Sequence, residues 1–408
     1  MGKYDTYFQM NVDDIVDYTL EKTKGKIDWD VATMEAIVPS SHGNLNYVYR
    51  VTDKKGHSIY IKQAAAASRI AEDIKCNIDR NTLESELLMI EDNYAPGMVP
   101  KIYFYDTIMC ACGMEDCSDY LVMREAMLQH KTYEQFADDI STFMVNTLLL
   151  SSDVVMNHKE KKEVLKKFIS PDLCDITEKL VLMEPYMDVY HRNNVYEPNA
   201  EYVKKELYED EKLHLEVAKL KFSFMTNAQA LLHGDLHSGS IFIKEGKTKV
   251  FDCEFGTYAP MGYDVGNLIA NLIFAYDNGL STDDEKFCNW TLATIEKSFD
   301  LFVEKFNKKF DEAVTEPMAK VKGFKEWYLS GILKDTAGYA GTELHRRTVG
   351  LANVVDVTTI ADEKKRLLAE RINIIAGKNF IMNQGAFLKG SDYVNAVKEA
   401  REKALKTL

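Results

Sequence analysis

The first third of the chain alternates apolar and polar residues in short runs, a pattern typical of β-strands. Residues 47–51 (YVYRV) form one such run, and residues 58–62 (SIYIK) form a second one after a polar turn. Together the two runs predict a β-hairpin. Beyond the hairpin, the pattern predicts a helix near residues 80–92 and two more strands, within residues 99–106 and 110–116.

From about residue 118 onward, the apolar residues follow a helical spacing instead. The clearest case is residues 211–232, where apolar positions three or four apart mark one helix face that we interpret as core packing. The chain then breaks at His233, and two short strands, residues 241–243 and 248–251, flank the turn EGK. Helical spacing returns after them and continues to the end. The apolar face of residues 211–232 consists of Leu213, Val217, Leu220, Phe224, Ala228 and Leu231.

The order of these elements predicts an α+β fold with two lobes, a small β-rich N-terminal one and a larger, mainly helical C-terminal one. Proline is scarce, with eight residues in the chain, and no linker-like segment separates the two parts. We therefore expect the lobes to pack together with a cleft between them, the kind of place where ligands bind.

The composition narrows the class of protein. The 408 residues carry a formal net charge of −14, which argues against nucleic-acid binding through a broad basic surface. An anionic substrate would need locally placed cations. Seven cysteines, without an apolar leader at the N-terminus, predict free thiols and a cytoplasmic location. The longest apolar stretch, residues 267–276, is too short to span a bilayer, so we expect no membrane association.

Three acidic residues lie beside apolar, strand-like runs, where an unpaired charge is costly. Asp235 follows the helix predicted to end near residue 232, while Asp252 and Glu254 follow the second short strand. If the chain stays extended there, Asp252 and Glu254 point the same way, and the hairpin could bring both near Asp235. Carboxylates at close range repel one another unless a cation lies among them. Mg²⁺ suits such oxygen ligands, with phosphate oxygens and water as its other ligands.

The order of an H-G-D loop, a short hairpin and a D-x-E segment is that of ATP-dependent phosphotransferases. In these enzymes the first Asp accepts or orients the proton of the attacking hydroxyl, and the later acids hold the metal. Gly43, Asn44 and Asn46 could form a loop over the phosphates, and Lys62 could reach the α- and β-phosphates as a compact cation. A lysine in a strand is usually a surface residue, so each feature alone is weak. Their joint order predicts ATP-dependent phosphoryl transfer.

Several segments then resemble one family. HGDLHSGSIFI, KVFDCEFGTYAPMGYDVGNLIANLIFAY, GNLNYVYRV, IKQA and HRRTVG are similar to the methylthioribose kinases, a branch of the protein-kinase-like fold shared with aminoglycoside and choline kinases. These segments are spread along nearly the whole chain. Most relatives have Asn five residues after the catalytic Asp, whereas this chain has Ser240, as is usual in methylthioribose kinases. The D-x-E metal motif of that family is matched by Asp252, Cys253 and Glu254.

The resemblance implies a reaction and the residues that carry it. ATP and 5-methylthioribose would give ADP and the 1-phosphate, a step of methionine salvage, with Mg²⁺ as cofactor and a homodimeric assembly. Asp235 would be the catalytic base and contact the substrate. Arg346 and Arg347 would stabilise the transferring phosphoryl group as catalytic residues, and Arg346 would also contact the sugar.

The resemblance also divides the chain into lobes. The segment MEDC, residues 114–117, would be the hinge that pairs with adenine, so that residues 1–117 form the nucleotide-binding lobe. Residues 118–408 would then form the catalytic and substrate-binding lobe. ATP contacts are expected at Asn44, Lys62, Glu115, Asp116, Cys117, Asp252, Cys253 and Glu254, and metal contacts at Asp252 and Glu254.

The chain departs from the family around this site. Residues 41–44 read SHGN where Asp-Gly-Asn is usual, residues 64–80 contain no Trp where a Trp-containing loop is usual, and Cys253 replaces a proline. These departures keep the three carboxylates, but they do not decide which sugar is the substrate. A kinase of 5-deoxyribose or another 5-substituted pentose is therefore an alternative.

Other functions are less well supported. An aminoglycoside or amino-alcohol kinase would need extra acids to hold amines, and the arginine pair argues against one. A pseudokinase, which binds nucleotide without catalysis, is disfavoured by the intact Lys62, Asp235, Asp252 and Glu254. His237 could act as a second base, but a role in the structure of the loop is the simpler interpretation.

Overall fold

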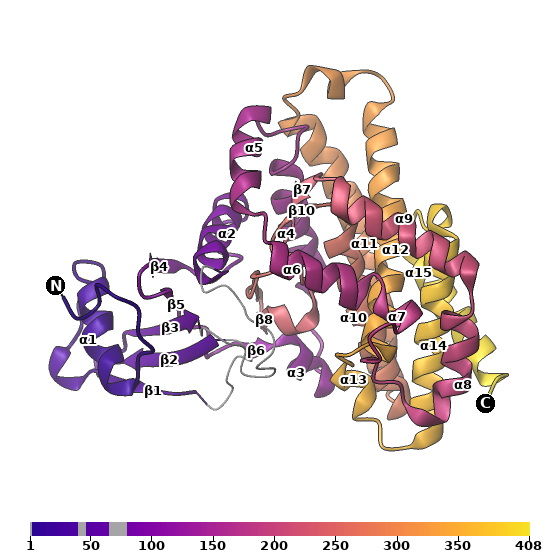
Figure 1. Cartoon of the computed structure of the whole chain (residues 1–408), viewed down its shortest axis with the longest axis horizontal. Helices are drawn as coiled ribbons and strands as arrows, with labels where there is room; N and C mark the ends of the chain where they lie inside the picture. The colour runs from indigo at the N-terminus through magenta and orange to yellow at the C-terminus, as the bar shows by residue number, and fades with distance from the viewer. Residues whose placement is uncertain (1, 40–45, 65–79) are drawn as a thin grey trace. The chain divides into compact units, whose positions relative to one another are not determined.

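The computed structural model of the chain describes residues 2–39, 46–64 and 80–408. Strands are concentrated in its N-terminal part, and helices make up most of the rest (Figure 1). Within these three ranges we find no helix that is both long enough and apolar enough to cross a membrane.

By their internal contacts the residues form two compact units. The first unit consists of Met1–Tyr120 and Lys249–Gly256, and the second consists of Leu121–Thr248 and Thr257–Leu408. The segment Lys249–Gly256, which contains the D-x-E motif, therefore belongs with the N-terminal residues although it lies far from them in the sequence.

The first unit is built on a five-stranded antiparallel sheet with the strand order β1-β2-β3-β5-β4. The predicted hairpin is confirmed as β2 and β3, in which Val48 pairs with Lys62 and Thr52 pairs with Ser58. The two further strands predicted from the sequence are also present, as β4 and β5. The bounds are β1 Glu35–Ile37, β2 Asn46–Thr52, β3 Ser58–Ala64, β4 Ile102–Asp106 and β5 Ala111–Glu115.

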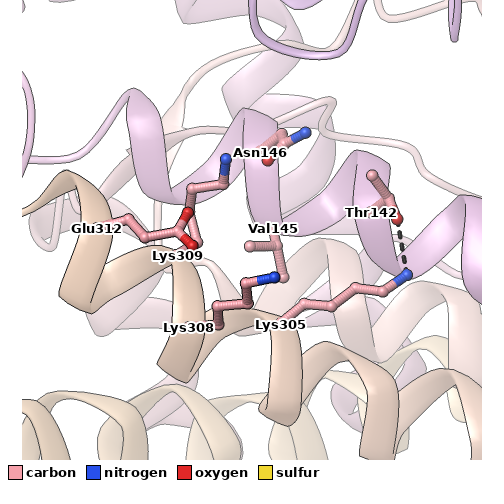
Figure 2. Close-up of a pocket in the computed structure, with 7 residues that line it drawn as sticks. All are labelled: Thr142, Val145, Asn146, Lys305, Lys308, Lys309 and Glu312. Atoms are coloured by element: carbon pink, nitrogen blue, oxygen red, sulfur yellow. Dashed lines mark hydrogen bonds between the residues drawn. The ribbon is translucent and has the colours of Figure 1, made fainter.

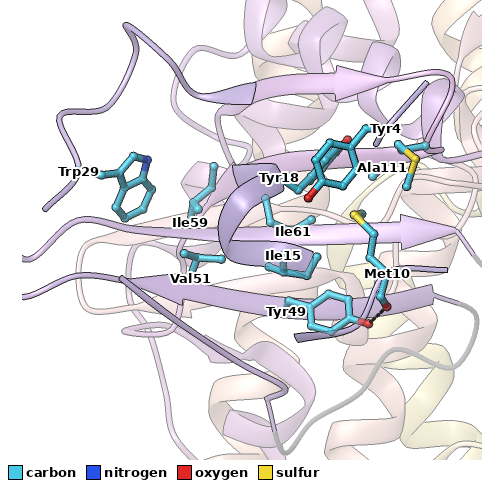
Figure 3. Packing of buried hydrophobic residues seen from close by; sticks show 11 residues of the cluster. Tyr4, Met10, Ile15, Tyr18, Trp29, Tyr49, Val51, Ile59, Ile61 and Ala111 are labelled. Carbon is cyan, nitrogen blue, oxygen red and sulfur yellow. Dashed lines mark hydrogen bonds between the residues drawn. The ribbon is translucent and has the colours of Figure 1, made fainter. Parts of the chain in front are cut away.

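One face of this sheet packs against helix α1 (Val12–Lys22) and the segments on either side of it. Alternate residues of β3, Ile59 and Ile61, point into this core and are fully buried, as Figure 3 shows. From α1, Ile15 and Tyr18 meet them there. Full burial of an aliphatic side chain stabilises a fold by about 1.5–3 kcal/mol. The apolar residues at alternate positions of β3 are therefore the ones that pack on α1.

The other face of β3 meets helix α2 (Arg80–Tyr94), the helix expected near residues 80–92. Asn81 donates its Nδ2–H to the carbonyl oxygen of Lys62 at 3.2 Å and lies 3.8 Å from the sulfur of Cys112 on β5. Because side chains alternate across a strand, Lys62 points toward α2 while Ile61 points into the core.

The second unit is mainly helical, and short strands connect its helices. Helix α10 is buried along almost its whole length, and α11 and α12 are the longest helices beside it (Figure 1). The larger helices are α4 Phe136–Leu150, α5 His158–Lys167, α9 Glu211–Thr226, α10 Gly262–Ser281, α11 Glu285–Ala313, α12 Phe324–Val349, α14 Glu363–Met382 and α15 Gly390–Leu405. The short elements used below are β6 Leu121–Val122, α3 Met123–Leu128, β7 Ala230–Leu231, β8 Ile241–Lys244, β9 Lys247–Val250, β10 Tyr258–Ala259 and α13 Val355–Thr358.

Glycine allows α10 to lie close to α12. A Cβ atom at Gly266 would lie 2.6 Å from the backbone nitrogen of Ala340, a distance at which one of the two helices would have to move. This close packing fixes the helix that carries Arg346 and Arg347.

The helix predicted over residues 211–232 is shorter than expected. Helix α9 ends at Thr226, and Asn227 follows with a non-helical backbone. Leu231 is buried as expected, but it lies in strand β7, which pairs with β10. Asp235 therefore follows a strand and not a helix, because burial on a sheet extended the apolar spacing beyond the end of α9.

Candidate active site

In the first unit, Lys62 lies among carboxylates. Its Nζ donates to Glu84 Oε1 on α2 at 2.7 Å and to Asp252 Oδ1 at 2.9 Å. The lysine side chain is 12% exposed, whereas that of Asp252 is 43% exposed. Lys62 thus connects helix α2 to the D-x-E segment, and the Asp252 side chain stays partly exposed.

The charges around Lys62 hold it protonated. Burial alone would lower its pKa, but Asp252, Glu84 and Glu254 raise the pKa well above that of a free lysine. One ammonium thus faces three carboxylates, which leaves a local excess of negative charge. Glu84 was not predicted from the sequence. The signal available was an acid on the first turns of the helix that follows the lysine-bearing strand.

The D-x-E segment is not extended as the sequence argument assumed. Asp252 has a positive φ of 65°, in the left-handed region, and Glu254 lies in the turn that follows. The assumption that period two aligns Asp252 with Glu254 is therefore wrong. The Cys253 thiol is buried and contacts the carbonyl oxygen of Glu84 at 3.7 Å, and burial raises its pKa well above the usual value.

The predicted hinge residues are also in the first unit. Glu115 ends β5, and its Oε2 accepts from Lys249 Nζ at 2.7 Å. Asp116 accepts from Arg50 Nε at 2.7 Å. The Cys117 side chain is buried, which raises the pKa of its thiol to about 12. The three side chains are therefore held within the unit, and a ligand would meet the backbone of this segment.

In the second unit, the loop that carries Asp235 is held by a buried acid on α10. Asp264 accepts from the backbone N–H of His233 at 2.8 Å and from that of Gly234 at 3.0 Å. Gly234 has a φ of 84°, a conformation that glycine adopts without strain. Burial raises the pKa of Asp264 to about 7 despite these two donors. The sequence analysis did not single out this residue.

Asp235 itself receives donors on both carboxylate oxygens. Arg346 donates to Oδ1 at 3.0 Å, and Arg347 lies 3.7 Å from the same atom. The Nε2 atom of His237 lies 3.2 Å from Oδ2. Burial alone would raise the pKa of Asp235, but His237, Arg346 and Arg347 lower it well below the usual range. Three residues predicted as catalytic, Asp235, Arg346 and Arg347, are thus brought together by the fold.

A buried carboxylate supports the two arginines from beneath. Glu343, one turn earlier on α12, accepts from the Nε atoms of both Arg346 and Arg347, the latter at 3.2 Å. Its side chain is fully buried, yet the two arginines lower its pKa and keep it ionised. Glu343 was missed from the sequence, although its spacing of three and four residues from the arginine pair is the helical contact spacing.

Some predictions concern residues that cannot be placed. Asn44 and Gly43, expected over the phosphates, and most of the segment 64–80 lie outside the described residues. The expected meeting of Asp235 with Asp252 and Glu254 joins residues of different units and stays a prediction.

A metal fits the donor set of the first unit. Within the described ranges, no group of three or more His, Cys, Asp or Glu side chains is arranged to hold a metal ion. Mg²⁺ does not need one, because proteins usually bind it through one or two carboxylates together with substrate phosphates and water. Asp252 and Glu254 supply hard oxygen ligands of this kind beside Lys62.

A separate hollow lies on the helical surface of the second unit. Figure 2 shows it where α4 and α11 lie side by side, with a volume of about 200 Å³. Lys305 is not free there, since its Nζ donates to Thr142 Oγ1 at 2.7 Å. None of the residues predicted for catalysis or ATP binding is among the described residues that line it, which are Thr142, Val145, Asn146, Lys305, Lys308, Lys309 and Glu312.

Comparison with known proteins gives a consistent result. Residues 173–286 match the phosphotransferase enzyme family. A methylthioribose kinase from Geobacillus sp. (strain WCH70) is 38% identical over 346 residues, which cover 84% of each chain. A methylthioribose kinase from Bacillus pumilus (strain SAFR-032) is 37% identical over 354 residues, 86% of this chain and 88% of the other.

A solved structure supports the fold. The crystal structure of a choline kinase from Cryptosporidium parvum Iowa II superposes with a TM-score of 0.51 at 12% identity, covering 97% of this chain and 98% of the other. At this identity the likeness concerns the fold alone. It confirms the α+β, protein-kinase-like class predicted from the sequence.

Proposed function

This chain belongs to the methylthioribose kinase family, and on that premise we propose that it transfers the γ-phosphoryl group of ATP to the anomeric hydroxyl of 5-methylthioribose. The products are ADP and 5-methylthioribose 1-phosphate, and the step belongs to methionine salvage. One observation carries the proposal: Asp235 is held ionised between Arg346 and Arg347 at one carboxylate oxygen and His237 at the other.

Asp235 orients the sugar hydroxyl and takes its proton. The hydroxyl oxygen attacks the γ-phosphorus, the bond from that phosphorus to the β,γ-bridging oxygen breaks, and ADP leaves. A carboxylate with a strongly lowered pKa is a weak base, so Asp235 accepts the proton late, when the new P–O bond has formed. Late transfer suits phosphoryl transfer, in which positioning and charge stabilisation supply most of the catalysis.

Arg346 and Arg347 stabilise the transferring phosphoryl group, and Arg346 also contacts the sugar. Guanidinium groups match phosphate oxygens with paired N–H donors. Glu343 holds both groups by their Nε atoms, which leaves the terminal nitrogens to face Asp235 and the substrate. This arrangement supports both roles.

The first unit supplies the nucleotide side. Lys62, held by Glu84, contacts the α- and β-phosphates, and Asn44 lies over the phosphates. The backbone of Glu115, Asp116 and Cys117 pairs with adenine, and residues 1–117 and 118–408 act as the nucleotide-binding and catalytic lobes. The D-x-E segment completes the ATP site: Asp252 and Glu254 would hold Mg²⁺, which neutralises phosphate charge when bound, and the Cys253 contribution comes from its backbone.

We place the enzyme in the cytoplasm as a homodimer that binds neither nucleic acid nor membrane. The net charge of −14 and the odd number of cysteines, seven, support the location. Homodimerisation rests on the resemblance to the family.

A second candidate substrate is 5-deoxyribose. The observation that favours it is the absence of Trp from residues 64–80, where the family usually has a Trp-containing loop near the substrate. The catalytic residues would be the same.

The test is ADP release by the purified chain with ATP and Mg²⁺ across 5-methylthioribose, 5-deoxyribose, ribose, choline and kanamycin. We expect the highest kcat/KM for 5-methylthioribose, and a release by the Asp235→Asn variant that is slower by a factor on the order of 10² or more. A higher kcat/KM for another compound would change the substrate. Nucleotide binding without turnover of any compound would overturn the kinase assignment.

A further inference from the structure

His237 lies between two polar partners in the loop that carries Asp235. Its Nε2 atom is 3.2 Å from Asp235 Oδ2, and its Nδ1 atom is 3.1 Å from Ser240 Oγ. Only 13% of its side chain is exposed. The three side chains therefore form a continuous chain of hydrogen bonds inside the second unit.

The partners fix which nitrogen of His237 carries the proton. An ionised carboxylate can only accept, so Nε2 must be protonated to contact Asp235. The neutral ring then presents Nδ1 as an acceptor, and the hydroxyl of Ser240 donates to it. Ser240 stands where most relatives of this fold have Asn. The Asp235 carboxylate thus sets the tautomer, and the Ser240 hydroxyl satisfies the other ring nitrogen.

The neighbouring backbone is shaped to hold the imidazole in this place. A Cβ atom at Gly239 would lie 2.8 Å from Cε1 of His237 and 2.9 Å from a terminal nitrogen of Arg124. Arg124 is itself fixed, because its Nε donates to Ser238 Oγ at 3.2 Å and its NH2 donates to Asn271 at 3.3 Å. The ring consequently has little room to rotate.

Burial, more than the surrounding charges, favours the neutral form of His237. Burial lowers its pKa, as do the nearby guanidinium groups of Arg124 and Arg347, while Asp235 opposes them. We conclude that the pKa of His237 lies below its ordinary value. The ring is then an N–H donor to Asp235 rather than a competing cation at neutral pH.

We propose that His237 is a positioning residue for phosphoryl transfer: through its Nε2–H it fixes the plane of the Asp235 carboxylate, while Ser240 donates to its other ring nitrogen. This proposal rests on the proposed function. The rotation of an Asp carboxylate about χ2 is soft, with broad minima. Arg346 holds one oxygen and His237 holds the other, so that the remaining lone pairs of Asp235 point at a defined position for the sugar hydroxyl.

Two variants of similar size separate a donor role from a packing role. His237→Gln places an amide N–H at the reach of Nε2, whereas His237→Met fills the space without a donor. We expect His237→Met to lower kcat by roughly 10- to 100-fold, the cost of misplacing a catalytic group by about an ångström, with the KM for ATP unchanged. His237→Gln should recover most of this loss. Ser240→Ala should give a smaller fall in kcat than His237→Met.

The control is His158→Met, since His158 is an exposed residue at the start of α5 and should leave kcat unchanged. Equal losses in His237→Gln and His237→Met would overturn the donor role, as would a kcat for His237→Met equal to that of the control. If the wild-type chain prefers another sugar, the proposed substrate fails, and the same variants are compared on that sugar.

A second measurement does not depend on turnover. In the full chain labelled with ¹⁵N-histidine, long-range ¹H–¹⁵N spectra at pH 7.5 report which ring nitrogen is protonated, and loss of signals in His237→Gln identifies the residue. We expect the Nε2–H form in the wild-type chain and also in Ser240→Ala, because the Asp235 carboxylate can only accept. An Nδ1–H form in the wild-type chain would overturn the proposal even if the kinase activity is confirmed.

Discussion

The charged clusters around Lys62 and around Asp235 differ in their balance of cations and acids. In the first unit, Lys62 faces Glu84, Asp252 and Glu254, so acids outnumber the cation. The second unit has as many cations as acids in its cluster: three guanidinium groups lie near three carboxyl groups, those of Arg124, Arg346 and Arg347 near those of Asp235, Glu343 and Asp356. An excess of one charge in a partly buried cluster is unfavourable unless a ligand of opposite charge is bound.

This difference indicates what each cluster is suited to receive. The acidic excess suits a cation, and magnesium-bound nucleotide brings one. The three guanidinium groups of the second cluster, the cationic cluster, suit phosphate oxygens, which carry growing charge during phosphoryl transfer. The comparison also ranks the residues by the expected effect of a substitution. A substitution that removes the catalytic base should lower activity more than one that only changes the balance of charges.

The largest effect is expected for Asp235→Asn in the cationic cluster. The amide cannot accept the proton of the sugar hydroxyl, so kcat should fall by a factor on the order of 10² to 10⁴. ATP binding should be nearly unchanged, since Asp235 has no place among the nucleotide contacts. Steady-state kinetics and nucleotide titration check both parts. An unimpaired variant would remove Asp235 from the mechanism.

The next largest effect concerns acid stability and distinguishes the units. His345, beside Arg346 on α12, donates Nε2–H to the carbonyl oxygen of Ile374 at 3.1 Å, and its pKa is lowered to about 4, chiefly by burial. Between pH 6.5 and about 4 the unfolded chain binds a proton that the folded chain does not, so stability falls as pH falls through this window. The full loss is about 3 kcal/mol.

Urea unfolding at a series of pH values measures this loss. The variant His345→Gln should lack this part of the pH dependence, whatever its stability at neutral pH. The matched change in the first unit, His57→Gln, alters a partly exposed ring and should keep the full pH dependence. The same slope in all three proteins would show that His345 is not the group responsible.

A smaller effect is expected for Arg346→Lys, which keeps the charge of the cationic cluster. Arg346 contacts Glu343 through Nε and Asp235 through a terminal nitrogen, and lysine, with a single nitrogen, cannot reproduce both contacts at these positions. We expect kcat to fall by roughly 10- to 100-fold, at or below the loss for a deleted donor at a transition state. Arg401→Lys, on the exposed part of α15, is the control. If both variants keep wild-type kcat, charge alone explains the role of Arg346.

The smallest effect is expected for Glu254→Gln in the acidic cluster. Asp252 remains, so activity should persist, but the Mg²⁺ concentration for half-maximal rate should rise roughly tenfold. Removing divalent metal with EDTA should abolish activity in both proteins. Glu86→Gln, elsewhere on α2, should leave the Mg²⁺ requirement unchanged. An unchanged requirement in Glu254→Gln would take Glu254 out of the proposed metal site.

The sequence predicted best where one local pattern decides the structure. Strands β2 and β3 alternate because one face packs on α1, and that alternation is visible in residues 47–51 and 58–62. The sequence-based prediction was wrong where the apolar spacing of a helix continued beyond the end of that helix. Leu231 kept the helical spacing although α9 had ended at Thr226, since a buried strand also needs an apolar residue.

The supporting acids of the site could not be read in the same way. Glu84 and Asp264 are single charged residues on helices, and each acts on a loop or strand that is distant in sequence. In the sequence such a residue cannot be distinguished from an acidic surface residue, because its partner is close only in the folded structure. The left-handed backbone of Asp252 could not be predicted either, because a single residue in this conformation does not change the periodicity of the sequence.

That left-handed residue narrows what evolution can place at position 252. Among side chains with a Cβ atom, Asp and Asn tolerate a φ of 65° best, and only Asp also carries a negative charge. Glycine would satisfy the backbone and lose the carboxylate, while glutamate would keep the charge and strain the turn. Both the backbone conformation and the charge therefore require aspartate at position 252. Replacement by glutamate, which is conservative at most acidic positions, is not conservative there.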